Sequence, residues 1–419
     1  MKDIAEKSLF DIPGGWKTLL WILVLLGIGM FIAGLMTGGE ESVVRTWQAF
    51  LINTVFWGGI AHAGVIFAVI WQITDAKWGR AFKRLAEACA GFLPISFLMF
   101  MVVFFGSHVL YEWTHTPFLH HGEAVKQGWL NLPFFISRNV FWLLLIYGIS
   151  YWFIKTSIKP DIALARRLIG SDWGGKFADW VLEDYGEHET EVIRLEKLSR
   201  KIAPVLALIY AIGGSFLAWD FVMTLDQTWF STLFGVFVMI GNMHAFLGLM
   251  LVVAVTVRKK FGIEEYISIN RLHDLAKMTF AFSLLWTYMG YSQYIVIWYA
   301  DLPEETPYLI IRSMNAPWNT LFLVIILWVF VSVFIGLLPR TLCRIPNYIR
   351  LMGIWVMLGQ LLSVYIMVVP SLQHDGHYHI FMGLHELLIT LGFVGAFFLC
   401  YLAFLGKLPI LPISDKHLC

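Results

Sequence analysis

The sequence predicts an all-α integral membrane protein with ten transmembrane helices. Composition is the first observation, because 58% of the 419 residues are hydrophobic and only 14% are charged, whereas a soluble domain carries about 25% charged residues. The second is a series of ten runs without Asp, Glu, Lys or Arg, most of them as long as the roughly 20 residues that cross a hydrocarbon core of about 30 Å. The third is a one-sided distribution of Lys and Arg between these runs.

Each charge-free run predicts one helix. In chain order the runs are 18–39, 46–74, 88–111, 139–154, 202–219, 227–257, 278–300, 313–339, 351–374 and 387–406. The two shortest runs, 139–154 and 202–219, reach spanning length if Arg138 and Asp220 lie at the membrane edge. No small-residue cleavage site follows the first run, so we expect a retained helix there and not a signal peptide.

Orientation follows from the basic residues. If the N-terminus is cytoplasmic, 26 of the 30 Lys and Arg residues fall in cytoplasmic segments, as the positive-inside rule requires. We therefore expect both termini in the cytoplasm. The four cysteines form neither a C-x-x-C nor a C-x-x-C-H pattern, so the chain offers no iron–sulfur site and no covalent haem attachment.

An internal repeat relates the two halves of the chain. Three short motifs recur in the same order with a shift of four helices: 59–63 and 241–245, 84–87 and 271–274, 133–138 and 307–312. A shift by an even number of helices keeps the membrane orientation. The repeat thus predicts two parallel-related four-helix bundles, helices 2–5 and helices 6–9, with helices 1 and 10 flanking them.

The expected division of the chain follows from this repeat. It comprises 1–42 (N-terminal tail and helix 1), 43–154 (helices 2–4), 155–201 (cytoplasmic connector), 202–223 (helix 5, closing the first bundle), 224–372 (second bundle, helices 6–9) and 373–419 (helix 10 and C-terminal tail). The Arg, Glu and Trp residues of the connector suit short amphipathic helices at the membrane interface. No soluble domain is expected.

Two histidines are predicted at membrane depth. Counting about 1.5 Å per residue from the membrane edge, His62 and His244 lie near the bilayer centre. Ionisable groups there are costly and are functional candidates by default. The alternative is a neutral imidazole that donates one hydrogen bond across a close helix contact, which the glycines and alanines around His62 favour. The repetition of the histidine favours the functional interpretation.

Other polar residues extend this pair into a predicted proton path in each bundle. They are Glu87 and Asp274 at the cytoplasmic ends, Tyr288 and Gln293 within helix 7, and Asp220, Arg138 and Arg312 at the outer ends. Each path would run from an inner carboxylate through a mid-membrane histidine to the outer face, with water or a mobile ligand bridging the gaps. For Glu87 and Asp274 the alternative is an exposed ion pair with the preceding Arg, worth under about 1 kcal/mol.

The outward loops are rich in histidine. These residues are His108, His115, His120, His121, His374, His377 and His379. The H-x-x-H-x-H spacing of the last three is not diagnostic of a metal site. We favour solvated loops and predict no metal. The acidic, aromatic stretch 295–312 has the character of a docking surface for an extramembrane partner.

Three stretches carry a family resemblance: RLAEACAGFLPI (84–95), AWDFVMTLDQTWFSTLFG (218–235) and the run from LHDLAK to YLIIR (272–312). They resemble the ActF-type polytopic subunits of bacterial alternative complex III, within the NrfD/polysulfide-reductase-type membrane-anchor family. The resemblance spans the chain and is weakest over the connector. It implies a subunit of a menaquinol:electron-acceptor oxidoreductase in the bacterial inner membrane, with no complete catalytic centre in this chain.

The resemblance also implies partners and cofactors. The partners would be a sister NrfD-like subunit, multihaem cytochrome c and iron–sulfur subunits, and lipids, with no nucleic acid. Haem c and iron–sulfur clusters would lie in the partner subunits, and menaquinone is a possible ligand here, although the residues identify no pocket for its ring. His62, His244 and Glu87 match the family pattern and are carried over as relay candidates.

Two other classes of function stay open at this point. One is a stand-alone secondary transporter, although no span carries the Gly/Pro-rich interruption that marks many substrate sites. The other is a b-haem anchor with His62 and His244 as axial ligands. The repeat places these histidines in separate bundles, whereas a bis-histidine haem needs them to face each other.

Overall fold

A computed structural model describes residues 2–37, 39–116, 119–120, 123–124, 126–373 and 379–415. Apart from a hairpin of β1 (Leu119–His120) and β2 (Glu123–Ala124), the regular structure of these residues is helical. Nine of the described helices are long and apolar enough to cross a membrane. The chain is therefore a multi-pass membrane protein, as the composition predicts.

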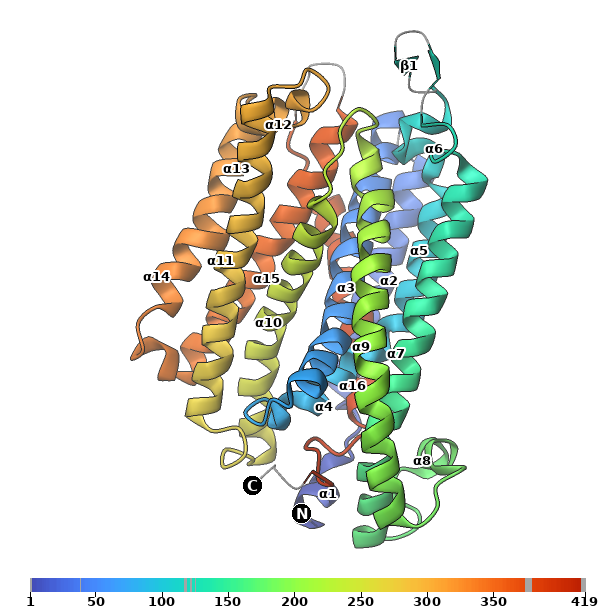
Figure 1. Cartoon of the computed structure of the whole chain (residues 1–419), viewed down its shortest axis with the longest axis vertical. Helices are drawn as coiled ribbons and strands as arrows, with labels where there is room; N and C mark the ends of the chain where they lie inside the picture. Colours follow the sequence, from blue (N-terminus) through green and yellow to red (C-terminus); the bar gives the residue numbers. More distant parts are fainter. Residues whose placement is uncertain are drawn as a thin grey trace.

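The long helices follow the predicted runs in order. They are α2 (Gly14–Thr37), α3 (Glu40–Thr74), α4 (Lys83–Glu87) leading through a 3-10 turn into α5 (Leu93–Phe105), α7 (Leu132–Ile169), α9 (His188–Phe221), α10 (Phe234–Phe261), α11 (Ile269–Ala300), α13 (Trp318–Ile326) leading through a π-helical turn into α14 (Val333–Leu337), α15 (Pro346–Val368) and α16 (Leu384–Leu405). Shorter helices are α1 (Lys2–Ser8), α6 (Ser107–Leu110), α8 (Gly175–Leu182) and α12 (Thr306–Ser313). In Figure 1, α1 and α8 lie at the lower end of the molecule and α6 and α12 at the upper end.

The predicted span 278–300 is the one without a counterpart among the nine. It lies within α11, a helix of 32 residues. The second half of α11 carries tyrosines together with Ser292 and Gln293, which lower its apolar character. The described residues thus contain nine candidate spans where the sequence predicts ten.

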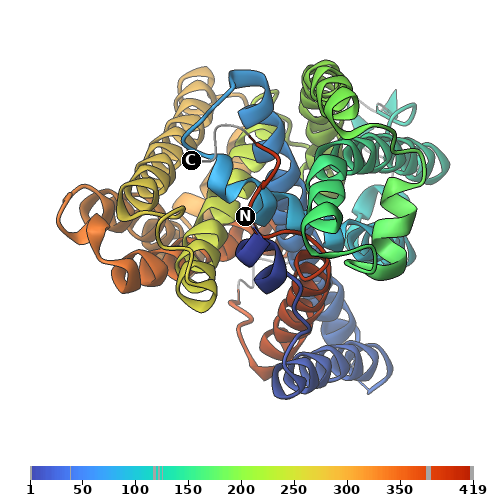
Figure 2. The ribbon, with the colours of Figure 1, turned by 90° about the horizontal axis from the view of Figure 1, so that it is seen from below.

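Helix α3 occupies the centre of the molecule. In its most apolar stretch 94% of the residues are buried, against 22% in α2. It packs against α5, α9, α10, α15 and α16, and Figure 2 shows three groups of helices around it: α5, α7 and α9; α10, α11 and α13–α15; and α2 with α16. Small residues on α3 permit this crowding. A Cβ on Gly59 would overlap Asn242 of α10, and one on Gly64 would lie 2.6 Å from Cys89 Cβ.

The connector predicted at 155–201 differs from the expectation. Helix α7 continues to Ile169 and α9 already begins at His188, so two long helices project beyond the others at the lower end (Figure 1). Only α8, between them, is a short helix of the expected kind. The physical reason lies in the pattern of α7, where Ile158, Ile162 and Ala165 recur at helical spacing and are buried, so that packing prolongs the helix.

Candidate functional site

His62 lies on α3 and is 5% exposed. Its ring packs against Tyr147 of α7, with centroids 4.8 Å apart, and against Tyr210 of α9, at 5.9 Å. Its Nε2 has no hydrogen-bond partner among the described residues. A cavity of about 40 Å³, lined also by Gly214, adjoins the imidazole. Since one water needs about 10–15 Å³ of such space, about three or four waters fit beside this ring.

Hydroxyl groups continue from His62 toward the lower end. Tyr147 Oη lies 2.9 Å from Ser96 Oγ of α5. One turn further along α7, Tyr151 donates a hydrogen bond of 2.9 Å to the carbonyl of Ala90. Sequence reasoning missed these groups because tyrosine and serine are ordinary residues of membrane helices.

The lower cluster consists of Arg84, Glu87 and Asp161, all buried. Arg84 Nε donates to Asp161 Oδ2 at 2.7 Å, and its Nη1 bonds Glu87 Oε2. Ser157 donates to the other oxygen of Glu87 at 2.6 Å, and the amide of Ser414 donates to Asp161 at 2.8 Å. Two carboxylates therefore share one guanidinium here, away from solvent.

The burial of Glu87 separates two interpretations of that residue. Its side chain is fully buried, so the exposed ion pair considered as the alternative does not describe it. Asp274, its counterpart in the repeat, is exposed and pairs with Lys277 at 3.1 Å. The alternative therefore describes Asp274, although the partner is Lys277 and not Arg271.

The upper cluster pairs Arg138 of α7 with Asp220 of α9. Two hydrogen bonds of 2.7 and 2.8 Å join the guanidinium to the carboxylate, and Asn139 donates a third of 2.8 Å. The start of α7 positions these donors, because Asn131 caps the helix by accepting from Phe134 N at 3.0 Å. Both ionic groups are buried, at 7% and 0% exposed, so the pair is shielded from solvent.

These groups form a series along the first helix group. Gly214 lines the cavity beside His62, and Asp220 follows six residues later on α9, which corresponds to about 9 Å. Ser96 lies nine residues after Glu87, or about 13 Å along a helix. The order from the lower end is thus Glu87, the hydroxyl pair, His62, the cavity and the Arg138–Asp220 pair, with gaps that water would have to bridge.

His244 of α10 is fully buried, and its Nδ1 lies 2.9 Å from Gln360 Nε2 of α15. Because an amide nitrogen only donates, Nδ1 accepts and the neutral ring carries its proton on Nε2. That Nε2 has no partner among the described residues. His244 thus accepts one hydrogen bond across a helix contact, whereas the neutral alternative expects the ring to donate one, and its own donor lacks a partner among the described residues.

A series of polar side chains and two small cavities lies between the two histidines at the centre of the molecule. Asn242 lines the cavity beside His62 and also a second cavity of about 10 Å³, which Gln360 lines as well. The order His62, Asn242, Gln360, His244 therefore runs laterally between α3 and α15. Asn242 lies inside the repeated motif 241–245, which is the signal that could have pointed to it.

The remaining residues of the second half are not brought together into a path. Tyr288 is 61% exposed, and Gln293 accepts a hydrogen bond of 3.1 Å from Ser231. Arg312 is buried, and its hydrogen-bond partners among the described residues are all neutral: the carbonyls of Tyr308, Ile366 and Met367 and the hydroxyl of Ser371. Burial lowers the pKa of Arg312 from its usual value.

The two arginines show where the halves differ. Arg138 meets the Asp220 side chain of α9, whereas Arg312 meets the backbone of Met367 in α15. A hydroxyl residue follows four positions later in both cases: Thr224 donates to the carbonyl of Asp220 at 2.5 Å and Ser371 to that of Met367 at 3.4 Å. Met367 thus stands where Asp220 stands in the first half, and it offers Arg312 no carboxylate. The described residues therefore assemble one series of polar groups, where the sequence predicts two equivalent paths.

Neither histidine site fits a haem or a quinone ring. Ligand pockets of that size enclose about 300–1,000 Å³, while the cavities near His62 and His244 measure about 40 and 10 Å³. In the outward loops, His115 Nε2 lies 2.7 Å from the carbonyl of His108. His121, His374 and His377, and the side chain of His120, lie outside the described residues.

No group of three or more His, Cys, Asp and Glu residues in the described part of the chain could hold a metal ion. The sequence matches no protein-family model, and a search of curated proteins finds no match either. Functional inference therefore starts from the buried series of polar groups around His62.

Proposed function

We propose that the chain is a membrane subunit of a menaquinol:electron-acceptor oxidoreductase of the alternative complex III type. In this proposal it resides in a bacterial inner membrane with both termini cytoplasmic, anchors periplasmic haem c and iron–sulfur subunits, and conducts protons. It lies beside a sister NrfD-like subunit. The observation that supports proton conduction is the position of His62, between two buried ionic clusters within one helix group.

The same proposal includes ten spans in two parallel-related bundles. Helix α11 would be the tenth span, since it packs against α10 and α14 and extends over much of the length of the molecule (Figure 1). The bundles would be α3, α5, α7 and α9, and α10, α11, α13–α14 and α15. The hydroxyl that donates to the carbonyl four residues earlier, Thr224 to Asp220 in α9 and its neighbouring turn and Ser371 to Met367 in α15 and its neighbouring turn, supports this pairing of helices.

In this path, the lower cluster takes up a proton from the cytoplasm. Glu87 and Asp161 share Arg84, and Ser157 connects to Glu87 through a hydrogen bond. Water would carry the proton past the Tyr147 hydroxyl to His62 Nε2, which has no competing partner in the described part of the chain. From the cavity beside His62 it would continue to the Arg138–Asp220 pair and leave on the outer side.

Menaquinol supplies the electrons and protons of the reaction when it is bound elsewhere in the assembly. This chain would contribute the route through the membrane, because the spaces beside its two histidines are too small for the quinone ring. The same sizes weigh against a b-haem anchor and against a transporter with its substrate at these histidines. No feature of the described fold supports the b-haem anchor or the stand-alone transporter.

The decisive experiment compares His62→Leu with the wild type in the purified assembly, reconstituted into vesicles. We expect proton translocation per quinol oxidised to be lost while quinol oxidation continues. Tyr288→Phe is the matched control, since its side chain is exposed on α11 and both measurements should stay unchanged. Unchanged translocation in His62→Leu would refute the path, and failure of the chain to copurify with haem c and iron–sulfur proteins would refute membership of the complex.

A further inference from the structure

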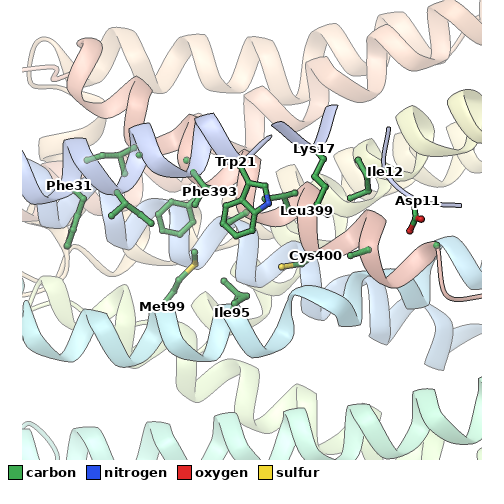
Figure 3. Close-up of a pocket in the computed structure, with 18 of the residues that line it drawn as sticks. Asp11, Ile12, Lys17, Trp21, Phe31, Ile95, Met99, Phe393, Leu399 and Cys400 are labelled. Atoms are coloured by element: carbon green, nitrogen blue, oxygen red, sulfur yellow. The ribbon is translucent and has the colours of Figure 1, made fainter. Parts of the chain in front are cut away.

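A long groove lies between α2, α5 and α16, and its volume is about 940 Å³. Figure 3 shows its labelled lining residues, from Asp11, Ile12 and Lys17 at one end to Phe31 at the other. The groove is separate from the His62 series and shares no lining residue with the cavities there. It is therefore a site that the proposed proton path does not use.

Glycine contacts between α2 and α16 create the groove. A Cβ on Gly27 would lie 2.5 Å from the Cα of Gly392, and one on Gly395 would lie 2.7 Å from the carbonyl oxygen of Leu20. The two backbones consequently touch, as small residues allow at membrane helix contacts. On the side toward α5, the small side chain of Ala396 leaves space that Ile95 of α5 borders but does not fill.

The walls of the groove are apolar over most of its length. Trp21, Phe31 and Phe393 line it together with Met99. Lys17 and Phe31 are fourteen residues apart on α2, which corresponds to about 21 Å, while one leaflet contributes about 15 Å of hydrocarbon. Such a groove favours extended hydrocarbon chains lying parallel to the helices.

Charge is confined to the lower end. Lys17, Lys407 and Asp11 line the groove there, and none of the three forms an ion pair with another described residue. The ammonium of Lys407 lies 5.4 Å from the ring centroid of Phe177, which leaves it able to accept an anionic ligand. The charged residues that line the groove, two positive and one negative, thus sum to one net positive charge.

We propose that this groove binds one glycerophospholipid that carries a single net negative charge. Its phosphodiester lies between Lys17 and Lys407, and its acyl chains lie along α2, α5 and α16. The net charge of the head balances that of the lining residues, whereas a zwitterionic lipid would leave one positive charge uncompensated. The inference uses only the membrane location of the chain and does not depend on proton conduction.

The test uses the protein purified with whatever subunits accompany it, stripped of loosely bound lipid and titrated with phosphatidylglycerol or phosphatidylethanolamine. Native mass spectrometry counts the retained lipids. We expect one tightly retained phosphatidylglycerol and weaker retention of phosphatidylethanolamine. An interfacial Lys contributes about 1 kcal/mol to anionic lipid binding, a factor of about five, so Lys17→Gln with Lys407→Gln should weaken retention about 25-fold.

Two controls separate charge from space. Lys201→Gln removes an exposed lysine of α9 that does not line the groove, and it should leave retention unchanged. Ala396→Trp fills the groove without altering charge and should abolish retention, whereas Ala281→Trp on the exposed face of α11 should not.

Equal retention of both lipids, equal retention by the double lysine variant, or displacement of the lipid by an isoprenoid quinone would each overturn the proposal. If Ala396→Trp fails to accumulate, the lysine variants still decide the question, because their side chains are at the surface. Loss of lipid retention with normal proton translocation would leave the proposed function intact. Normal lipid retention without proton translocation would leave the proposed lipid site intact.

Discussion

Replacing Asp220 with Asn removes one charge from the buried pair at the upper end and keeps the shape of the side chain. Arg138, 7% exposed, would then lack its counterion. Removing one partner of a buried ion pair costs about 3–5 kcal/mol. The guanidinium also lies over the ring of Trp129, 3.8 Å from its centroid, but this contact is present with either side chain and does not change the difference. We expect a loss of about 3–5 kcal/mol in the free energy of unfolding.

The assay is denaturant-induced unfolding of the purified protein in mixed micelles. The exposed pair Arg200–Glu196 provides the control, because its N–O distance is 2.8 Å and its side chains are 56% and 54% exposed. Glu196→Gln should cost under about 1 kcal/mol. Adding Arg138→Gln to Asp220→Asn should recover part of the loss, since no buried charge then remains unpaired. Equal costs for Asp220→Asn and Glu196→Gln would contradict the reasoning from burial.

Three further outcomes are expected. Gly59→Leu should destabilise the protein by about 1–3 kcal/mol through overpacking against α10, whereas Gly148→Leu, with open space around its Cβ, should be neutral in the same unfolding assay. Tyr147→Phe removes the 2.9 Å contact with Ser96 but keeps the ring, so proton translocation in vesicles should fall several-fold with quinol oxidation unchanged; equal translocation would exclude this hydroxyl from the path. Burial raises the pKa of Tyr185, in the turn before α9, to about 12. The stabilisation from its neutral form is therefore complete below pH 10 and is lost as the pH rises toward 12, and a pH titration of stability should show a loss that Tyr185→Phe lacks.

The sequence predicted the helical elements well because long charge-free runs are a strong signal. Nine of the ten predicted runs correspond to candidate spans, and the burial of His62 and His244 follows from their place within such runs. The exception, α11, carries enough tyrosine and amide groups to weaken that signal. Hydropathy measures the free-energy cost of placing a side chain in lipid. It takes no account of the protein surface against which such a helix packs.

The partners of each site residue could not be predicted in the same way. Asp161 joins Arg84 and Glu87, yet its position in the sequence falls within a segment expected to be a connector. Residues about 70–80 positions apart meet only if each helix has the right rotation about its own axis. Packing between helices sets that rotation, and it cannot be read from a single sequence. For the same reason Asp274 and Tyr288 share the composition of a relay residue but face outward.

The central position of α3 also bears on how the chain assembles in the membrane. This early helix has little surface left for lipid once it is packed, and two of its neighbours, α10 and α15, belong to the later half of the chain. Until those segments have been synthesised, the face of α3 that carries Gly59 lacks the Asn242 side chain that covers it. The first and second halves of the chain are therefore not separate folding units, and a fragment ending before α10 would lack part of the surface that holds α3 in place.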